Sequence, residues 1–218
     1  MGRAYDLFTR LAINRVKPKM INLLKVDLWN EGVEREKDVL SKYQNIPRLD
    51  LYAVDIAKNI CFLAKPNVPK VHITQATIEK LPFKDDCFDV ILDLSTLDHI
   101  PETKAIGVIK EYKRVLNKNG VLLLIFRYEN LQNKSGRKKT DTSYYFSKKL
   151  IRTAEKSLES VEEYTIGALL PFASLLDKLP KQLRNFILDL NLTFERQELS
   201  KNMLKQLGAF YVIIGQNS

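Results

Sequence analysis

The chain has 218 residues and a formal net charge of +9, and 45% of its residues are hydrophobic and 28% charged. These values are typical of one globular domain, so we expect a single domain over residues 1–218. No apolar run reaches the roughly 18 to 20 residues of a membrane-spanning helix, and two cysteines with two histidines predict neither a disulfide framework nor a metal site.

The first 20 residues mix apolar and basic side chains, lack the small-residue cleavage site of a secretory leader, and are expected to form an N-terminal helical segment. The isolated Cys61 and Cys87 favour reduced thiols and a cytoplasmic protein. The excess of positive charge has two interpretations, which the sequence leaves open. It is typical of a protein that binds an anionic partner, such as a nucleic acid, a phosphate-bearing metabolite or a membrane surface. It is equally typical of a protein whose lysine-rich surface serves solubility alone.

The middle of the chain alternates between strand and helix patterns. Short runs rich in Val, Ile and Leu predict strands buried on both faces of a parallel sheet, at residues 49–55, 71–76, 88–95 and 120–126. An amphipathic stripe predicts a helix from Pro101 to Leu116, ended by a turn over residues 117–120. This alternation predicts an α/β fold, Rossmann-like and doubly wound, with helices on both faces of a mostly parallel sheet.

The pattern changes after Phe126. Residues 127–143 are polar and basic and predict an exposed loop, in which Lys134 and residues 137–139 are candidates for contacting an anion or simply for solvation. A helix is expected near residues 146–157 and a strand near 161–165. Apolar residues at helical spacing then predict a small helical lobe over residues 167–205, divided by Pro180 into two helices and inserted before the last strand at 209–217.

Acidic side chains stand where the predicted strands end, and ligands of open α/β sheets bind beyond those carboxyl ends. Asp55 there suits two roles: accepting hydrogen bonds from the vicinal hydroxyls of a ribose, or capping the helix that follows. Asp98 and His99 also allow two interpretations. The imidazole is suited to accept a proton from a substrate. Alternatively, His99 shapes the loop while Asp98 caps the next helix.

Three motifs in chain order carry a family resemblance. Leu81-Pro82-Phe83 precedes Phe88-Asp89-Val90-Ile91, Leu97-Asp98-His99-Ile100-Pro101 follows the next strand, and residues 111–126 read EYKRVLNKNGVLLLIF. In this order they resemble the class I S-adenosylmethionine-dependent methyltransferases, in particular the small-molecule branch that includes type 11. The resemblance covers roughly residues 50–126. It implies a seven-stranded sheet, S-adenosyl-L-methionine as cofactor and S-adenosyl-L-homocysteine as product.

The resemblance also implies roles for single residues. It places Asp55 on the ribose hydroxyls, Ile56 and Ile78 against the two faces of the adenine, and Thr77 at the adenine edge, where the family commonly has an aspartate. Asp98 and His99 are its candidate catalytic residues. The full predicted cofactor-binding set is Asp27, Leu28, Asn30, Glu31, Asp55, Ile56, Thr77, Ile78, Leu94 and Ser95.

The first cofactor loop departs from the family. Its usual D-x-G-x-G-x-G becomes "DLWNEG", which keeps Asp27 but puts Trp29, Asn30 and Glu31 where small residues are expected. In one interpretation, Asn30 adopts the positive φ that asparagine tolerates, Asp27 or Glu31 accepts from the cofactor ammonium, and Trp29 packs away or walls the site. In the other, the pocket is closed and the domain is catalytically silent. A lone tryptophan is also often a core residue.

We favour the first interpretation, because a silent relative has little need for so many acids at strand ends. The stretch from Asp27 to Asp55 is longer than is usual in the family, which predicts a displaced or extended first helix. Three functions are compatible with the sequence: methyl transfer to a small-molecule or lipid-like acceptor, which we favour; methyl transfer to RNA; or a non-catalytic interaction module. The apolar stripe of the lobe, which in this fold would cover the acceptor side, suits a partly hydrophobic acceptor or simple packing onto the sheet.

Overall fold

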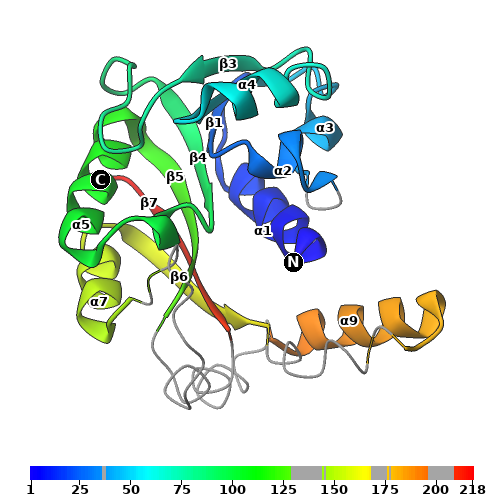
Figure 1. Ribbon diagram of the computed structural model, residues 1–218. Helices are drawn as coiled ribbons and strands as arrows, with labels where there is room; N and C mark the ends of the chain where they lie inside the picture. The colour runs from blue at the N-terminus through cyan, green and yellow to red at the C-terminus, as the bar shows by residue number, and fades with distance from the viewer. Residues whose placement is uncertain (36–37, 129–143, 145, 168–175, 177, 196–208) are drawn as a thin grey trace.

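The protein is built around one sheet of seven strands, in the order β3-β2-β1-β4-β5-β7-β6 (Figure 1). The computed structural model describes residues 1–35, 38–128, 144, 146–167, 176, 178–195 and 209–218. The strands are β1 (Ile21–Val26), β2 (Leu49–Asp55), β3 (His72–Gln75), β4 (Phe88–Leu94), β5 (Leu116–Arg127), β6 (Glu159–Ile166) and β7 (Phe210–Gln216).

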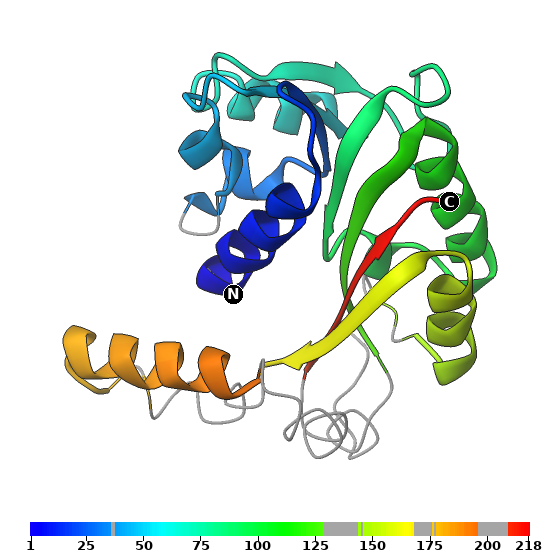
Figure 2. The same ribbon diagram turned by 180° about the vertical axis from the view of Figure 1, so that it is seen from behind.

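Helices cover both faces of this sheet, as the two opposite views show (Figures 1 and 2). One face packs against α1 (Gly2–Arg15), α2 (Trp29–Gly32), α3 (Leu40–Tyr43) and α4 (Lys58–Ala64), and the other against α5 (Glu102–Val115) and α7 (Lys148–Lys156). Each face therefore has its own apolar core, and the buried strands carry side chains on both sides, as parallel sheets require.

The strand order places a topological switch point at the centre of the sheet. Strand β1 is paired in parallel with β2 on one side and with β4 on the other, and β7 is antiparallel to both β5 and β6. The chain therefore proceeds outward from β1 in one direction and from β4 in the other. Open α/β sheets bind their ligands at the carboxyl ends beside such a point, and we call this place the crevice. The predicted Rossmann-like, mostly parallel seven-stranded sheet is confirmed.

Two local predictions differ from the structure. The turn expected at residues 117–120 lies inside β5, which begins at Leu116 directly after α5; only Asn119, with φ 61°, retains a turn-like conformation there. The long connection between β1 and β2 holds two short helices, α2 and α3, instead of one extended helix.

The motif residues that carried the family resemblance mostly hold each other in place. The Glu111 carboxylate accepts from the Leu81 amide at 2.7 Å, and the Arg114 guanidinium donates to the carbonyl oxygens of Leu81 and Phe83 at 3.2 and 2.9 Å. Arg114 also pairs with Glu111 and Asp85. These contacts fasten the segment before β4 to helix α5, so this part of the motif is structural.

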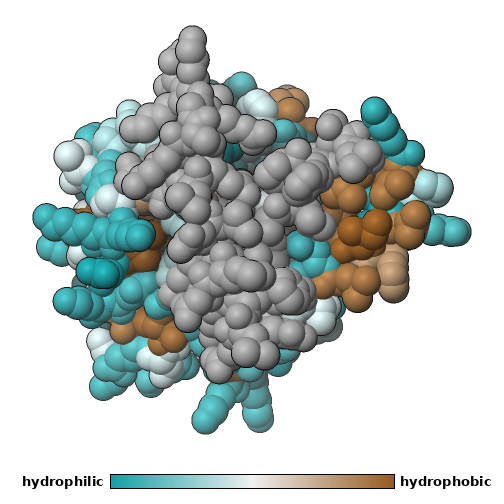
Figure 3. All heavy atoms as spheres, turned by 90° about the horizontal axis from the view of Figure 1, so that it is seen from below, coloured by the Kyte–Doolittle hydropathy of each residue, from teal (hydrophilic) through white to brown (hydrophobic). Residues whose placement is uncertain are grey.

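The second helix expected in the lobe is α9 (Lys181–Glu195), which begins directly after Pro180 and lies beside β6 and the start of α1. Its Leu183, Phe186 and Leu190 are exposed, and apolar side chains gather over this helix at the right of Figure 3. The first predicted lobe helix and the basic residues 134 and 137–139 lie outside the described residues. Within the described part of the chain, no helix is long and apolar enough to cross a membrane.

Candidate functional site

Both strands that flank the switch point end in a non-glycine residue with left-handed backbone. Asp27 follows β1 with φ 74°, and Ser95 follows β4 with φ 72°. The Thr96 hydroxyl then donates to the carbonyl oxygen of Val26 at 3.2 Å, which ties the two strand ends together. The chain thus turns sharply at both sides of the crevice.

Asp27 forms the first wall of this crevice. Its amide donates to the carbonyl of Val54 in β2 at 2.8 Å, and its carboxylate Oδ1 accepts from the Trp29 amide at 2.6 Å, which closes an Asx turn into α2. The positive φ expected at Asn30 is therefore found at Asp27, and that expectation was wrong. Asn30 lies within α2 and is buried, because the turn is already complete three residues earlier.

Asp55 joins the ends of β1 and β2. Its Oδ2 accepts from the Leu28 amide and its Oδ1 from the Ala57 amide, both at 2.8 Å. Burial raises the pKa of this carboxyl more than the two backbone hydrogen bonds lower it. Asp55 thus holds the turns that follow β1 and β2. The expectation that it caps the next helix was wrong, because the N-cap of α4 is Ala57 and has no side-chain capping bond. Each carboxylate oxygen has a second lone pair, which keeps the ribose role open.

The side chains that were expected to contact an adenine differ in their exposure to solvent. Ile56 is 71% exposed beyond the end of β2, whereas Ile78 is buried in the core beside α5 and does not present a free face. The Thr77 hydroxyl accepts from the Glu79 amide at 3.3 Å. Leu28 and Leu94, also in the predicted set, belong to the core beneath α1 to α4.

Trp29 and Glu31 point in opposite directions from α2. Trp29 is 48% exposed, so it is not a core residue. Glu31 is fully buried and pairs with Lys25 of β1, with 2.8 Å between Oε2 and Nζ. Its expected contact with a cofactor ammonium does not agree with this placement, because the carboxylate is turned into the protein. Lys25 was missed, although a lysine inside the apolar run "INLLKV" was a signal for it.

The neighbouring residues Asp98 and His99 differ in exposure, since Asp98 is buried and His99 is exposed. The Asp98 carboxylate is buried, accepts from the Arg127 amide at 2.6 Å and lies 3.8 Å from the Arg127 guanidinium. Burial raises the pKa of Asp98 to about 8 despite these contacts. Asp98 therefore fastens the short helix η2 (Leu97–His99) to the end of β5 and does not cap α5. His99 is exposed beside the crevice.

Two further side chains complete this edge. Tyr5 of α1 reaches Ser95, with 3.2 Å between the hydroxyl oxygens, and burial raises its pKa to about 12. Asp93 is fully buried and bonds the Tyr112 hydroxyl at 2.8 Å and the amides of Thr96 and Leu97. No local pattern could reveal the Tyr5 contact, because 90 residues separate it from Ser95.

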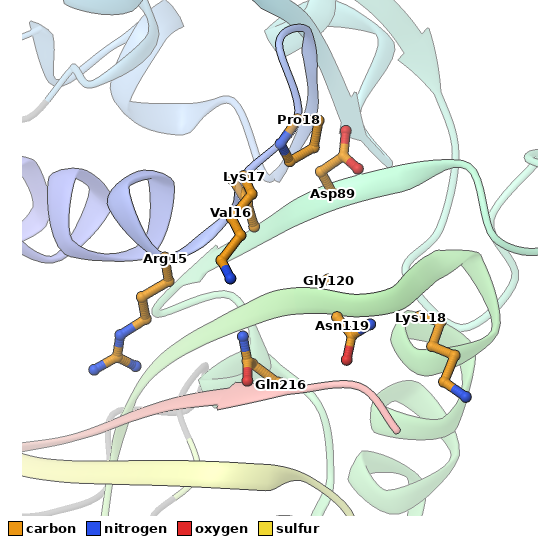
Figure 4. A pocket seen from close by; sticks show the side chains of 9 residues that line it. All are labelled: Arg15, Val16, Lys17, Pro18, Asp89, Lys118, Asn119, Gly120 and Gln216. Carbon is orange, nitrogen blue, oxygen red and sulfur yellow. The ribbon is translucent and has the colours of Figure 1, made fainter.

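A cavity of about 450 Å³ lies at the opposite edge of the sheet (Figure 4). It is lined by residues from the end of α1 and the segment after it, the starts of β4 and β5, and the end of β7, among them Arg15, Lys17, Asp89 and Lys118. Two of these charges are already engaged, because Arg15 pairs with Glu162 and Asp89 accepts from the Asn22 amide. The cavity is thus distinct from the crevice described above.

Comparison with known proteins gives one matching family model and one relative in sequence. Residues 32–124 match the family model of the methyltransferase domain, type 11. An uncharacterized Haemophilus influenzae protein is 27% identical over 135 residues, which cover 55% of this chain and 54% of that one, so the match spans about half of the relative.

Solved structures agree in fold at low identity. A SAM-dependent methyltransferase from Archaeoglobus fulgidus is 12% identical with a TM-score of 0.62, and the match covers 99% of this chain and 94% of that one. The [4+2]-cyclase SpnF is also 12% identical, with a TM-score of 0.63 and coverage of 99% and 81%. The protein therefore shares the Rossmann-like fold of these methyltransferases. Residues 32–124, somewhat less than half of the chain, are similar to the methyltransferase domain of type 11, and the altered loop over residues 27–32 ends at the start of this match.

Proposed function

We propose that the protein transfers a methyl group from S-adenosylmethionine to a small-molecule or lipid-like acceptor. The observation that carries the proposal is the pair of carboxylates, Asp27 and Asp55, at adjacent strand ends of the switch point in a chain that matches the methyltransferase domain. The fold alone does not carry it, because the cyclase SpnF shares the fold.

The residues at the crevice suit the cofactor chemically. Asp55 is half-buried and retains acceptor capacity for ribose hydroxyls, and exposed Ile56 offers an apolar surface to an adenine. The Asp27 Oδ2 has no partner among the described residues, so it can accept from an ammonium group. The bound cofactor would supply a methyl group on a sulfonium, which is already a good electrophile.

His99 is the candidate base in this proposal. It is exposed next to the crevice, so its imidazole can accept a proton from an acceptor hydroxyl or amine. We assign Asp98 a positioning role instead, because its carboxylate is bonded to the Arg127 amide and holds η2 against β5. Much of the rate enhancement would then come from holding the acceptor in line with the methyl group.

The nature of the acceptor rests on two observations. The exposed Leu183, Phe186 and Leu190 on α9 support an acceptor with a hydrophobic part. The net charge of +9 favours RNA as the rival acceptor. A gel-shift assay with RNA at increasing salt concentrations distinguishes the two kinds of acceptor, because contacts to RNA phosphates weaken steeply with salt.

Calorimetric titration with S-adenosylhomocysteine tests the proposal. We expect saturable heat with one site per chain. In a separate assay with methyl-labelled S-adenosylmethionine, we expect the label to be transferred into an organic-soluble acceptor fraction. Saturable binding without transfer to any acceptor would favour the interaction module. The absence of binding to both S-adenosylmethionine and S-adenosylhomocysteine would overturn the proposal.

A further inference from the structure

The buried pair Lys25–Glu31 lies directly beneath the altered loop. Lys25 is the last inward-facing residue of β1 on the face covered by α1 to α4, after Ile21 and Leu23, which are both core residues. Its side chain is 1% exposed and that of Glu31 is fully buried. A charged pair therefore occupies a place where strand alternation calls for an apolar side chain.

Lys25 contacts the backbone of the loop as well as Glu31. Its Nζ donates to the carbonyl oxygen of Asp27 at 2.5 Å and to the Glu31 carboxylate at 2.8 Å. Asp27 is the residue with φ 74°, a conformation that costs an L-residue energy and that glycine would adopt freely. The ammonium group thus holds the strained residue through its carbonyl.

Glu31 extends this connection to the next helix. Its Oε1 accepts from the amides of Val39 and Leu40 at the start of α3, both at 3.3 Å, and its own carbonyl accepts from the Asn67 side chain at 2.8 Å. Burial lowers the pKa of Lys25, but the charges of Glu31 and Asp27 outweigh it and raise the pKa overall. Lys25 is therefore charged at neutral pH, and the pair joins β1, α2 and α3.

Stability alone does not explain such a pair. Replacing a buried ion pair by apolar side chains of similar volume is often neutral or stabilising, whereas removing one partner is strongly destabilising. We propose that Lys25 and Glu31 are positioning residues that take the place of the missing glycines and hold the β1–α2 turn in the shape that receives the methionine part of the cofactor. This inference rests on the proposed function.

The double variant K25M/E31L separates positioning from stability. It removes both charges together and leaves no unpaired buried charge, so we expect a folded protein. Its Tm should be lower than that of the wild type, because the Val39 and Leu40 amides lose their acceptor, and affinity is therefore compared well below both transitions. We expect affinity for S-adenosylhomocysteine to fall about tenfold or more, the loss that accompanies one missing charge-assisted hydrogen bond. The variant L23M, on the same strand and face, is the matched control and should bind as the wild type does.

Trp29 gives a second readout that needs no ligand. It is the chain's one tryptophan and lies in the turn itself, so quenching of its fluorescence by acrylamide reports the turn directly. We expect stronger quenching in K25M/E31L and unchanged quenching in L23M. If the double variant does not fold, K25M/E31Q, which also removes both charges but keeps an acceptor oxygen for the Val39 and Leu40 amides, should show the same changes.

The two readouts distinguish the possible failures. A folded double variant with wild-type affinity and wild-type quenching would overturn the positioning role. If the wild type itself binds neither S-adenosylmethionine nor S-adenosylhomocysteine, the proposed function fails. The quenching comparison then still shows whether the pair holds the turn.

Discussion

Asp27 and Ser95 occupy equivalent places on neighbouring parallel strands, and both have left-handed backbone, with φ 74° and 72°. Val26 is paired with Asp93 across β1 and β4, so both strands turn away from the sheet at nearly the same level. Neither residue is glycine. The crevice is thus formed by two strained turns, each supported by a hydrogen bond: Lys25 to the Asp27 carbonyl, and Tyr5 with the Ser95 hydroxyl.

The strain at Ser95 can be measured by comparing two substitutions. S95A and S95G both remove the hydroxyl that contacts Tyr5, and they differ only in the Cβ atom. We expect S95G to be more stable than S95A by about 1 kcal/mol, because only the alanine retains the cost of positive φ. Thermal and urea unfolding measure the difference. Equal stabilities would show that the backbone at Ser95 is not strained.

Replacing Asp55 should affect both binding and folding. We expect D55A to weaken binding of S-adenosylhomocysteine by about 1 to 3 kcal/mol, the scale for losing hydrogen bonds to a charged acceptor. It should also lower Tm, because the Leu28 and Ala57 amides lose their acceptor. D55N keeps one acceptor oxygen and should recover part of the stability. Unchanged affinity in D55A, measured by calorimetry, would remove Asp55 from the ribose site.

The two histidines of the chain provide a matched pair of variants. His99 lies beside the crevice, whereas His72 is an exposed residue of β3, 3.2 Å from Asp50. We expect H99A to lower kcat while leaving affinity for the cofactor nearly unchanged, because the substrate loses its proton acceptor. H72A should change neither. Parallel losses of kcat and affinity in H99A would indicate a structural role for the imidazole.

Asp98 predicts a dependence of stability on pH. Its pKa in the folded protein, about 8, is above the ordinary 3.8, so the folded state binds this proton more tightly than the unfolded state does. The stabilisation it contributes is complete below about pH 4 and is lost as pH rises to about 8, with a slope near 1.4 kcal/mol per pH unit.

The variant D98N isolates this effect, because its amide oxygen can still accept from the Arg127 amide but does not titrate. We expect the stability of the wild type relative to D98N to fall steadily between pH 5 and pH 8. Denaturant unfolding at several pH values measures this difference. A difference that stays constant over that range would show that the Asp98 pKa is ordinary in the folded state.

The strand predictions succeeded where burial imposed a pattern on neighbouring residues. The run from Leu49 to Asp55 was placed to the residue, because a strand covered on both faces is rich in apolar side chains, and five of these seven residues are apolar. The acids at Asp27 and Asp55 were recognised as strand ends for the same reason. The strand predicted over residues 88–95 ends one residue earlier in the structure, at Leu94, because Ser95 already has left-handed backbone.

Tertiary contacts decided what those residues do. The sequence could not show that Glu31 turns inward to Lys25, that Asp98 is bonded to the Arg127 amide, or that Tyr5 reaches Ser95. Each of these depends on which side of a strand end a side chain faces and on what lies opposite it. Local periodicity therefore determined the fold class and the edge of the sheet that holds the site. Only the packing of distant segments determined which acids at that edge are buried as structural partners and which remain available to a ligand.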